Sequence, residues 1–339
     1  MYYPLHRSRS LSSRLSASTT VSMSMFSGRS IKSFASAILI TLGVVSFFLQ
    51  CSRWGPGNRK TLNISDTAAE TAPASSIPEK IWYKVGPKGI STEAREWMNT
   101  CLEKNPTFEH EILTDSLADT YVIERFVHRP EIVETYLALS IPILKADLLR
   151  YLLLFAEGGL WSDLDVSCGD TPIRDWIPEQ YRNNASLVVG WEFQTVDDQH
   201  MREFVTWMIM SKPGLPHMSM VINDTLQALH EKAREHKVPI SGLNMDMVGD
   251  IVWLTGPMAM SKSIIKSLGI EKDNINSGAT PYVFEPQLFD DVLILPGYSF
   301  SASMQQYKDE EHPGPALVTH HYVGSWKNGN GGEEANPVS

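Results

Sequence analysis

Residues 143–166 read ILKADLLRYLLLFAEGGLWSDLDV, and this stretch decides the fold. Its first fifteen residues place apolar side chains at i, i+4, i+7, i+8 and i+11, which predicts a buried helix. Gly158 and Gly159 follow, and glycine readily adopts the left-handed backbone that ends a helix. The last seven residues alternate between apolar and polar side chains, which predicts a strand.

Similar patterns continue on both sides of this stretch. They predict strands at 81–85, 108–114, 187–193 and 316–319, and helices at 92–103, 201–210 and 219–235. Strands that alternate with helices are typical of an α/β sheet covered by helices. We therefore expect one α/β domain over residues 77–327.

An Asp-X-Asp pair, Asp163 and Asp165, lies in the predicted strand. Residues i and i+2 share a face of a strand, so both carboxylates should point the same way, with Leu164 turned into the core. A hard divalent cation such as Mn²⁺ or Mg²⁺, itself bound to diphosphate oxygens, would relieve their repulsion. For an isolated Asp-X-Asp pair, the alternative interpretation is a solvated strand end.

Asp147 and Arg150 are spaced i, i+3 on the apolar helix before this pair. In the simplest interpretation they form a surface ion pair worth ~0.3 to 0.5 kcal/mol. We favour a functional role, because charges in apolar surroundings are costly without a partner. Asp147 would accept hydrogen bonds from sugar hydroxyls, and Arg150 would contact the sugar or a phosphate.

The charge distribution separates a basic leader from an acidic domain. Residues 1–60 contain eight basic residues and no acidic one, so all 39 acidic and 21 of the 29 basic residues follow, a net charge of −18. Nucleic-acid binding needs clustered Lys and Arg to displace counterions from phosphates. We therefore expect no nucleic-acid partner.

Residues 33–52 contain no charged side chain and are long enough, at ~1.5 Å per residue, to span the ~30 Å core of a bilayer. The basic, acid-free tail at 1–32 predicts a cytosolic N-terminus and a type II signal-anchor topology. A cleaved signal peptide is the alternative, although its apolar region is usually ~7 to 15 residues long. Small, polar and proline residues at 53–76 indicate a stem, and 328–339 indicate a disordered tail.

Three cysteines, Cys51, Cys101 and Cys168, are too few for a disulfide scaffold. A bridge between Cys101 and Cys168 and two buried free thiols are both open interpretations. The Asn-X-Ser/Thr sequons are compatible with exposure in a secretory lumen and stand at Asn63, Asn184 and Asn223.

Seven short segments occur in order through the predicted domain. They are IPEKIW (77–82), ILKADLLRY (143–151), GGLWSDLD (158–165), VVGWE (188–192), KPG (212–214), TGP (255–257) and HHYVGSWK (320–327). Together they resemble glycosyltransferase family 32, and within it the fungal outer-chain initiating α-1,6-mannosyltransferases. The resemblance implies a GT-A type, Rossmann-like nucleotide-sugar-binding domain behind an N-terminal transmembrane helix, with GDP-mannose as donor, Mn²⁺ as metal and retention of anomeric configuration.

The resemblance also implies roles for individual residues. Asp165 resembles the direct metal ligand, Asp163 points to the ribose or a metal-bound water, and the histidine ligand is His320 or His321, with His320 favoured. The implied metal set is Asp163, Asp165 and His320; the catalytic set is Asp147, Arg150, Asp163 and Asp165; the donor-binding set is Trp82, Asp147, Arg150, Gly158, Gly159, Asp163, Ser325 and Trp326.

The expected function is transfer of mannose from GDP-mannose to N-glycans of glycoproteins, by a lumenal domain anchored in the Golgi membrane. The resemblance implies a nucleotide-sugar donor, a glycan acceptor and a multiprotein Golgi mannosyltransferase complex as partners. Two alternatives stay open: a mannosyltransferase acting on a glycolipid such as inositol phosphoceramide, and a non-catalytic lumenal glycan-binding protein of the same fold.

Overall fold

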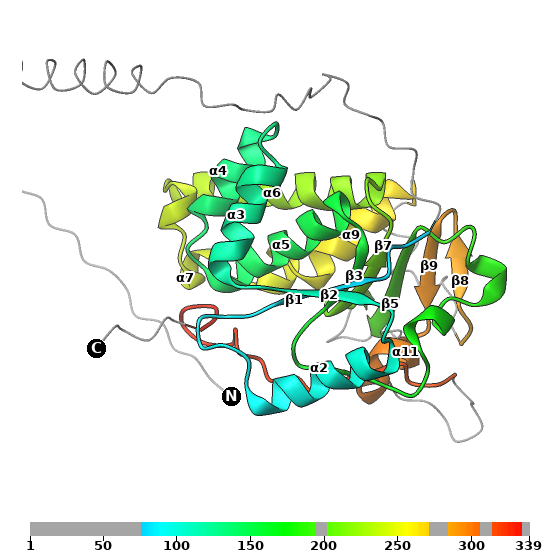
Figure 1. Cartoon of the computed structure of the whole chain (residues 1–339). Helices are drawn as coiled ribbons and strands as arrows, with labels where there is room; N and C mark the ends of the chain where they lie inside the picture. Colours follow the sequence, from blue (N-terminus) through cyan, green and yellow to red (C-terminus); the bar gives the residue numbers. More distant parts are fainter. Residues whose placement is uncertain (1–75, 194–201, 271–283, 306–313, 334–339) are drawn as a thin grey trace, which may run out of the picture. The chain divides into compact units, whose positions relative to one another are not determined.

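The computed structural model describes residues 76–193, 202–270, 284–305 and 314–333 (Figure 1). The predicted cytosolic tail at 1–32, membrane helix at 33–52 and stem at 53–76, apart from Ser76, lie outside the described residues. Within those described ranges, no helix is both long and apolar enough to cross a membrane.

The described part of the chain forms an eight-stranded mixed sheet with the order β2-β1-β3-β7-β5-β9-β8, to which β6 adds beside β5, and a two-stranded sheet of β4 and β10. The strands are β1 Lys80–Lys84, β2 Glu109–Leu113, β3 Gly159–Ser162, β4 Val166–Cys168, β5 Leu187–Phe193, β6 Glu203–Phe204, β7 Met208–Ser211, β8 Gln287–Phe289, β9 Val292–Leu295 and β10 Val318–His320.

Helices cover both faces of the large sheet (Figure 1). They are α2 Thr92–Lys104, α3 Asp115–Arg125, α4 Pro130–Ala138, α5 Pro142–Ala156, α6 Pro216–His236, α7 Met245–Val248, α8 Ile251–Leu254, α9 Pro257–Ser267 and α11 Gly297–Ser301. Short 3₁₀ turns occur at Ile173–Asp175, Glu179–Tyr181, Ile240–Gly242 and Ala302–Met304.

Alternating side chains of the strands divide between two hydrophobic cores. Trp82, Trp161 and Ile209 face the core formed with α3, α4, α5, α6 and α9. Their neighbours Tyr83 and Leu160 face the core formed with α2 and α11. Burying apolar area on both faces stabilises the sheet by about 25 cal/mol per Å². The expected α/β fold class is therefore confirmed at the level of a mixed sheet between helices.

The helix predicted over 201–210 is wrong. Residues Glu203–Phe204 and Met208–Ser211 form β6 and β7, and every residue of β7 is buried. β7 lies between β3 and β5 and is antiparallel to both. A strand covered on both faces is apolar throughout, so it lacks the period of two that identifies a half-exposed strand.

The turn between α5 and β3 depends on its two glycines. Gly158 and Gly159 have positive φ values of 68° and 94°. A Cβ on Gly158 would lie 2.6 Å from the Ser211 carbonyl oxygen, and one on Gly159 would lie 2.6 Å from that of Lys80. Trp82 donates a 2.8 Å hydrogen bond from Nε1 to the Gly158 carbonyl. These contacts seat β3 between β1 and β7.

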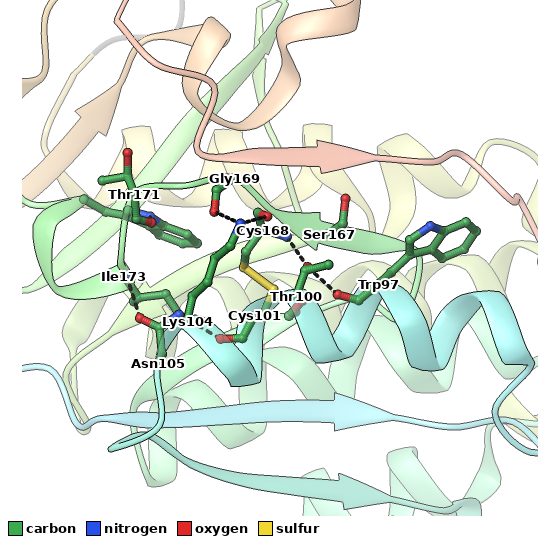
Figure 2. Close-up of a disulfide and its surroundings, with 12 residues drawn as sticks. Trp97, Thr100, Cys101, Lys104, Asn105, Ser167, Cys168, Gly169, Thr171 and Ile173 are labelled. Atoms are coloured by element: carbon green, nitrogen blue, oxygen red, sulfur yellow. Dashed lines mark hydrogen bonds between the residues drawn. A yellow bond between two sulfur atoms is a disulfide. The ribbon is translucent and has the colours of Figure 1, made fainter.

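A disulfide joins Cys101 on α2 to Cys168 on β4 (Figure 2). The Cys168 amide donates a 2.8 Å hydrogen bond to Thr100 Oγ1, and Lys104 Nζ donates to the carbonyls of Cys168 and Gly169. Of the two interpretations that the sequence left open, the structure has the bridge. It fixes α2 against β4, which begins directly after Asp165.

Residues 328–333 pack against the domain, so the disordered tail predicted from Asn328 begins too early. The Ile143 amide donates a 2.9 Å hydrogen bond to the Gly331 carbonyl, and Gly332 lies close against Pro142. The C-terminal segment, residues 314–333, therefore contacts the start of α5, the helix that carries Asp147 and Arg150.

Candidate active site

A cavity of about 510 Å³ lies where β1, β3 and β5 end. β1 and β3 are parallel, and β3 and β5 are each antiparallel to β7, so all three end at the same edge of the sheet. Ligands of open α/β sheets bind outside the carboxyl ends of strands. Predicted site residues that line the cavity are Asp147, Arg150, Asp163, Asp165, His320, Ser325 and Trp326.

Asp163, Leu164 and Asp165 form the turn between β3 and β4, so the prediction that both acids share one face of a strand is wrong. The Asp163 amide still donates to the Trp207 carbonyl at 3.0 Å, but the chain then leaves the large sheet. Val166 pairs instead with His320 in β10. The two acids therefore reach the cavity from a turn.

Arg150 links the helix to this turn. Its Nη1 atom lies 3.1 Å from Asp147 Oδ1, and its Nη2 atom lies 3.4 Å from Asp163 Oδ1. Arg150 and Asp147 are only 4% and 2% exposed, so their interaction is a buried ion pair rather than a surface one. Loss of Asp147 would leave the buried Arg150 charge with only Asp163 to compensate it, and loss of Arg150 would leave the Asp147 carboxylate buried without a cation.

Both carboxylate oxygens of Asp147 have protein partners. Oδ1 pairs with Arg150, and Oδ2 accepts a 2.6 Å hydrogen bond from Thr255 Oγ1. Burial raises the pKa of Asp147, while the charge of Arg150 and the hydrogen bond from Thr255 oppose that rise. Within the described residues, Asp147 therefore holds the Arg150 side chain in place and is itself held by Thr255.

Asp163 is fixed in the same way. Its Oδ1 atom accepts a 2.7 Å hydrogen bond from Trp161 Nε1 and lies near Arg150. Burial raises the pKa of Asp163, the Arg150 guanidinium opposes the rise, and the nearby charge of Asp165 adds to it. Trp161 and Arg150 therefore hold the Asp163 carboxylate in place, whereas neither of them contacts Asp165.

Asp165 contacts the C-terminal segment. Its Oδ1 atom lies 3.3 Å from His320 Nε2, and its Oδ2 atom accepts a 3.0 Å hydrogen bond from the Val323 amide. The His320 ring stacks on Trp207, with 4.2 Å between ring centroids. Burial alone would raise the pKa of Asp165, but the contacts with His320 and Val323 lower it below its usual range.

The three predicted metal ligands do not form one cluster. No group of three or more His, Cys, Asp or Glu side chains among the residues described could hold a metal ion. Asp163 is engaged by Trp161 and Arg150, as described above. Asp165 and His320 do fit a cation as neighbouring ligands, because donor atoms at ~2.1 Å from an octahedral ion lie roughly 3 Å apart. The remaining ligands would come from a bound diphosphate.

His320 and His321 occupy different environments. The His321 ring stacks on Trp97 at 4.1 Å, and its Nε2 atom lies 2.9 Å from Ser167 Oγ. His320 is the one beside Asp165. The geometry therefore favours His320 for a role in the site, in line with the preference drawn from the sequence.

Three predicted donor-binding residues, Trp82, Gly158 and Gly159, are absent from the described lining of the cavity. Gly158 and Gly159 lie at the turn into β3, and Trp82 on β1 is 2% exposed and donates a hydrogen bond from Nε1 to the Gly158 carbonyl. We assign these three a structural role. A resemblance between short sequence segments does not separate residues that contact a ligand from residues that shape the turn beneath it.

Sequence reasoning assigned no role to two carboxylates that line the cavity, Glu192 and Glu203. Burial raises the pKa of Glu192 to about 8, and the charge of Glu203 adds to the rise while Lys327 opposes it. The available signal was the acid at the end of the predicted strand 187–193, at the edge where a ligand binds.

The comparisons with known proteins agree with this geometry. Residues 91–183 match the family model described as a glycosyltransferase sugar-binding region containing a DXD motif. The chain is 30% identical over 290 residues to the initiation-specific alpha-1,6-mannosyltransferase of Candida albicans, an alignment that covers 74% of this chain and 72% of that protein. The chain belongs to glycosyltransferase family 32.

Two further proteins are similar to it. The initiation-specific alpha-1,6-mannosyltransferase of Schizosaccharomyces pombe is 30% identical over 266 residues, covering 75% of this chain and 64% of that protein. The mannosyl phosphorylinositol ceramide synthase CSH1 of Saccharomyces cerevisiae is 27% identical over 97 residues, covering 29% and 25%. The expected enzyme class, a glycosyltransferase, is confirmed, so the non-catalytic alternative is set aside.

Proposed function

We propose that this family 32 protein is a metal-dependent, retaining glycosyltransferase with a GT-A fold that transfers mannose from GDP-mannose to an N-glycan. The names of the two relatives aligned over three quarters of the chain support mannose as the transferred sugar, and the N-glycan acceptor follows from the resemblance. The order of the strands and the acidic turn after β3 support the fold type.

The Asp165–His320 pair at 3.3 Å is the observation that carries the proposal. It faces a cavity that also contains the Arg150 guanidinium, so a diphosphate would meet the charge of Arg150 on one side and that of a cation held by the pair on the other. A divalent cation, when bound, would neutralise charge that develops on the departing diphosphate.

The protein's own groups orient the donor. Asp147 and Asp163 hold the Arg150 guanidinium in one place, so its charge needs no reorganisation when the diphosphate departs. Ser325 and Trp326 line the same cavity from the C-terminal segment. We assign them contacts with the diphosphate, which would close the cavity over the donor.

A lumenal location in the Golgi, behind a type II anchor, is part of the proposal. A disulfide persists in an oxidising compartment, and Cys101–Cys168 therefore supports a lumenal domain. The sequon asparagines Asn184 and Asn223 are exposed, which supports the same side of the membrane. Membership of a multiprotein mannosyltransferase complex remains a prediction from the resemblance.

A glycolipid acceptor is the second candidate, because part of the chain matches a mannosyl phosphorylinositol ceramide synthase. The deciding experiment supplies the full-length chain with GDP-mannose, Mn²⁺ and either a high-mannose N-glycan or inositol phosphoceramide in detergent. Mannose added to the N-glycan, located by linkage analysis at a 6-hydroxyl, supports the first candidate. Addition to the lipid alone would support the second and overturn the first.

A further inference from the structure

The C-terminal segment ends in a turn built on the side chain of Asn328. Its Nδ2 atom donates hydrogen bonds to the carbonyls of Ser325 and Gly332, at 3.1 Å and 2.9 Å. Its Oδ1 atom accepts hydrogen bonds from the amides of Asn330 and Gly332, at 2.9 Å and 3.2 Å. The turn rests on the start of α5, as described above, so the backbone that leads to residue 333 is fixed.

Glu333 follows this turn and lines the cavity beside the loop after β1. Its Oε2 atom accepts a long hydrogen bond, 3.4 Å, from the Lys88 amide. A Cβ on Gly86 would lie 2.6 Å from the same oxygen, so the carboxylate occupies space that a glycine leaves open. Figure 1 shows the red end of the described chain beside this loop. A carboxylate and a backbone N–H therefore stand together at this side of the cavity.

The order of the strands separates this side from the sugar end. β3, which leads into the Asp-X-Asp turn, has β1 on one side and β7, then β5, on the other. Glu192 and Glu203 line the cavity at the β5–β6 end, where carboxyl groups suit the hydroxyls of a sugar. With a diphosphate held after β3 by Arg150 and the Asp165–His320 pair, the β1 end remains for the base of the nucleotide.

The groups on the β1 side match the edge of one base. Guanine presents O6, which accepts a hydrogen bond, beside N1–H and the 2-amino group, which both donate. The Lys88 amide is a donor, and the carboxylate of Glu333 offers two acceptors. Uracil presents one N–H between two carbonyl oxygens, and adenine presents the acceptor N1 beside its amino group. Of these three bases, guanine alone gives all three protein groups a partner.

We propose that Glu333 reads the guanine base of the donor, accepting hydrogen bonds from N1–H and the 2-amino group while the Lys88 amide donates to O6. This inference rests on the proposed function, which supplies GDP-mannose as the donor. The base replaces the long contact between Glu333 and Lys88. Glu333 then determines which nucleotide binds and leaves the chemistry at C1 of the sugar unchanged.

Inosine diphosphate tests this inference, because it is GDP without the 2-amino group. The dissociation constants of GDP, inosine diphosphate and UDP are measured by isothermal titration calorimetry with the full-length chain and Mn²⁺. The variant is Glu333→Ala. The control is Glu103→Ala, which truncates an exposed carboxylate on α2 that is absent from the described lining of the cavity.

We expect the wild type to bind GDP about 10-fold or more tightly than inosine diphosphate, because a hydrogen bond to a charged acceptor is lost with the 2-amino group. UDP should bind more weakly than GDP by at least the same factor. In Glu333→Ala both preferences should fall to about threefold or less, mainly through weaker binding of GDP. Glu103→Ala should keep the wild-type preferences.

A wild type that binds GDP and inosine diphosphate equally would overturn this inference and leave GDP-mannose standing as the donor. An unchanged preference for GDP in Glu333→Ala would also overturn it, even with weaker binding of all three nucleotides, because the residue would then act through the fold and not on the base. Binding of UDP but not of GDP by the wild type would overturn the proposed donor, and this inference would fail with it.

Discussion

Asp165 Oδ1 lies 3.3 Å from His320 Nε2, which joins the Asp-X-Asp turn to a strand more than 150 residues later in the chain. The contact depends on the pairing of β4 with β10, since Val166 is the register partner of His320. The C-terminal segment therefore contributes His320 to the site.

Metal affinity should depend on this pair. We expect His320→Ala to weaken Mn²⁺ binding in the presence of GDP by about 10-fold or more, because one of two neighbouring protein ligands is lost. Free Mn²⁺ measured by electron paramagnetic resonance during titration gives the affinity. His110→Ala, at an exposed position on β2, is the control. Unchanged affinity in His320→Ala would exclude His320 as a ligand.

The buried ion pair predicts a large effect on stability. Asp147→Ala should lower the free energy of unfolding by about 3 kcal/mol, because Arg150 stays buried with less compensation. Asp224→Ala removes one partner of the more exposed Asp224–Lys266 ion pair and should cost less than about 1 kcal/mol. Urea unfolding measures both. Equal losses would mean that Asp147 is not held as the structure describes.

Glu192 predicts a dependence of stability on pH. Its pKa is about 8 in the folded protein and about 4.3 in an unfolded chain. Between these values the folded protein holds a proton that the unfolded chain has released, so the free energy of unfolding falls as pH rises.

Glu192→Gln should remove this contribution to the free energy of unfolding. The contribution is on the order of 1–3 kcal/mol between pH 5 and 8, which is less than the full pKa shift would give, because solvent partly screens the side chain. Chemical unfolding of both proteins at several pH values measures the difference. Parallel pH profiles would contradict the raised pKa of Glu192.

The disulfide should stabilise the domain. The double variant Cys101→Ser/Cys168→Ser is expected to lose about 2–5 kcal/mol of unfolding free energy. Dithiothreitol should lower the Tm of the wild type and leave that of the double variant unchanged. A wild-type Tm that is insensitive to reductant, with the thiols shown to be free, would contradict the bridge.

The sequence predicted much of the fold because its local signals were strong. The apolar period of 143–157 and the glycines after it identified α5 and the turn into β3. The helix expected at 201–210 failed because β7 is buried on both faces, so its pattern carries no strand period. Only the pairing with β3 and β5 distinguishes these alternatives.

The candidate site was predicted in part. Asp147 and Arg150 were singled out by charge in apolar surroundings and the Asp-X-Asp pair by its spacing, and all four line one cavity. The turn conformation of Asp163–Asp165 was missed because it follows from β4 leaving the large sheet for β10. For Glu192 the only local signal was its place near the end of the predicted strand 187–193, since its burial and its neighbour Glu203 arise from tertiary structure.

Metal-dependent transfer is tested most directly by the release of GDP from GDP-mannose by the full-length chain, with and without Mn²⁺, beside an Asp165→Ala variant. We predict turnover that requires Mn²⁺ and is lost in the variant, because Asp165 faces the cavity beside His320. Turnover that is independent of the metal, or that persists in Asp165→Ala, would contradict a metal-dependent transferase with Asp165 as a ligand.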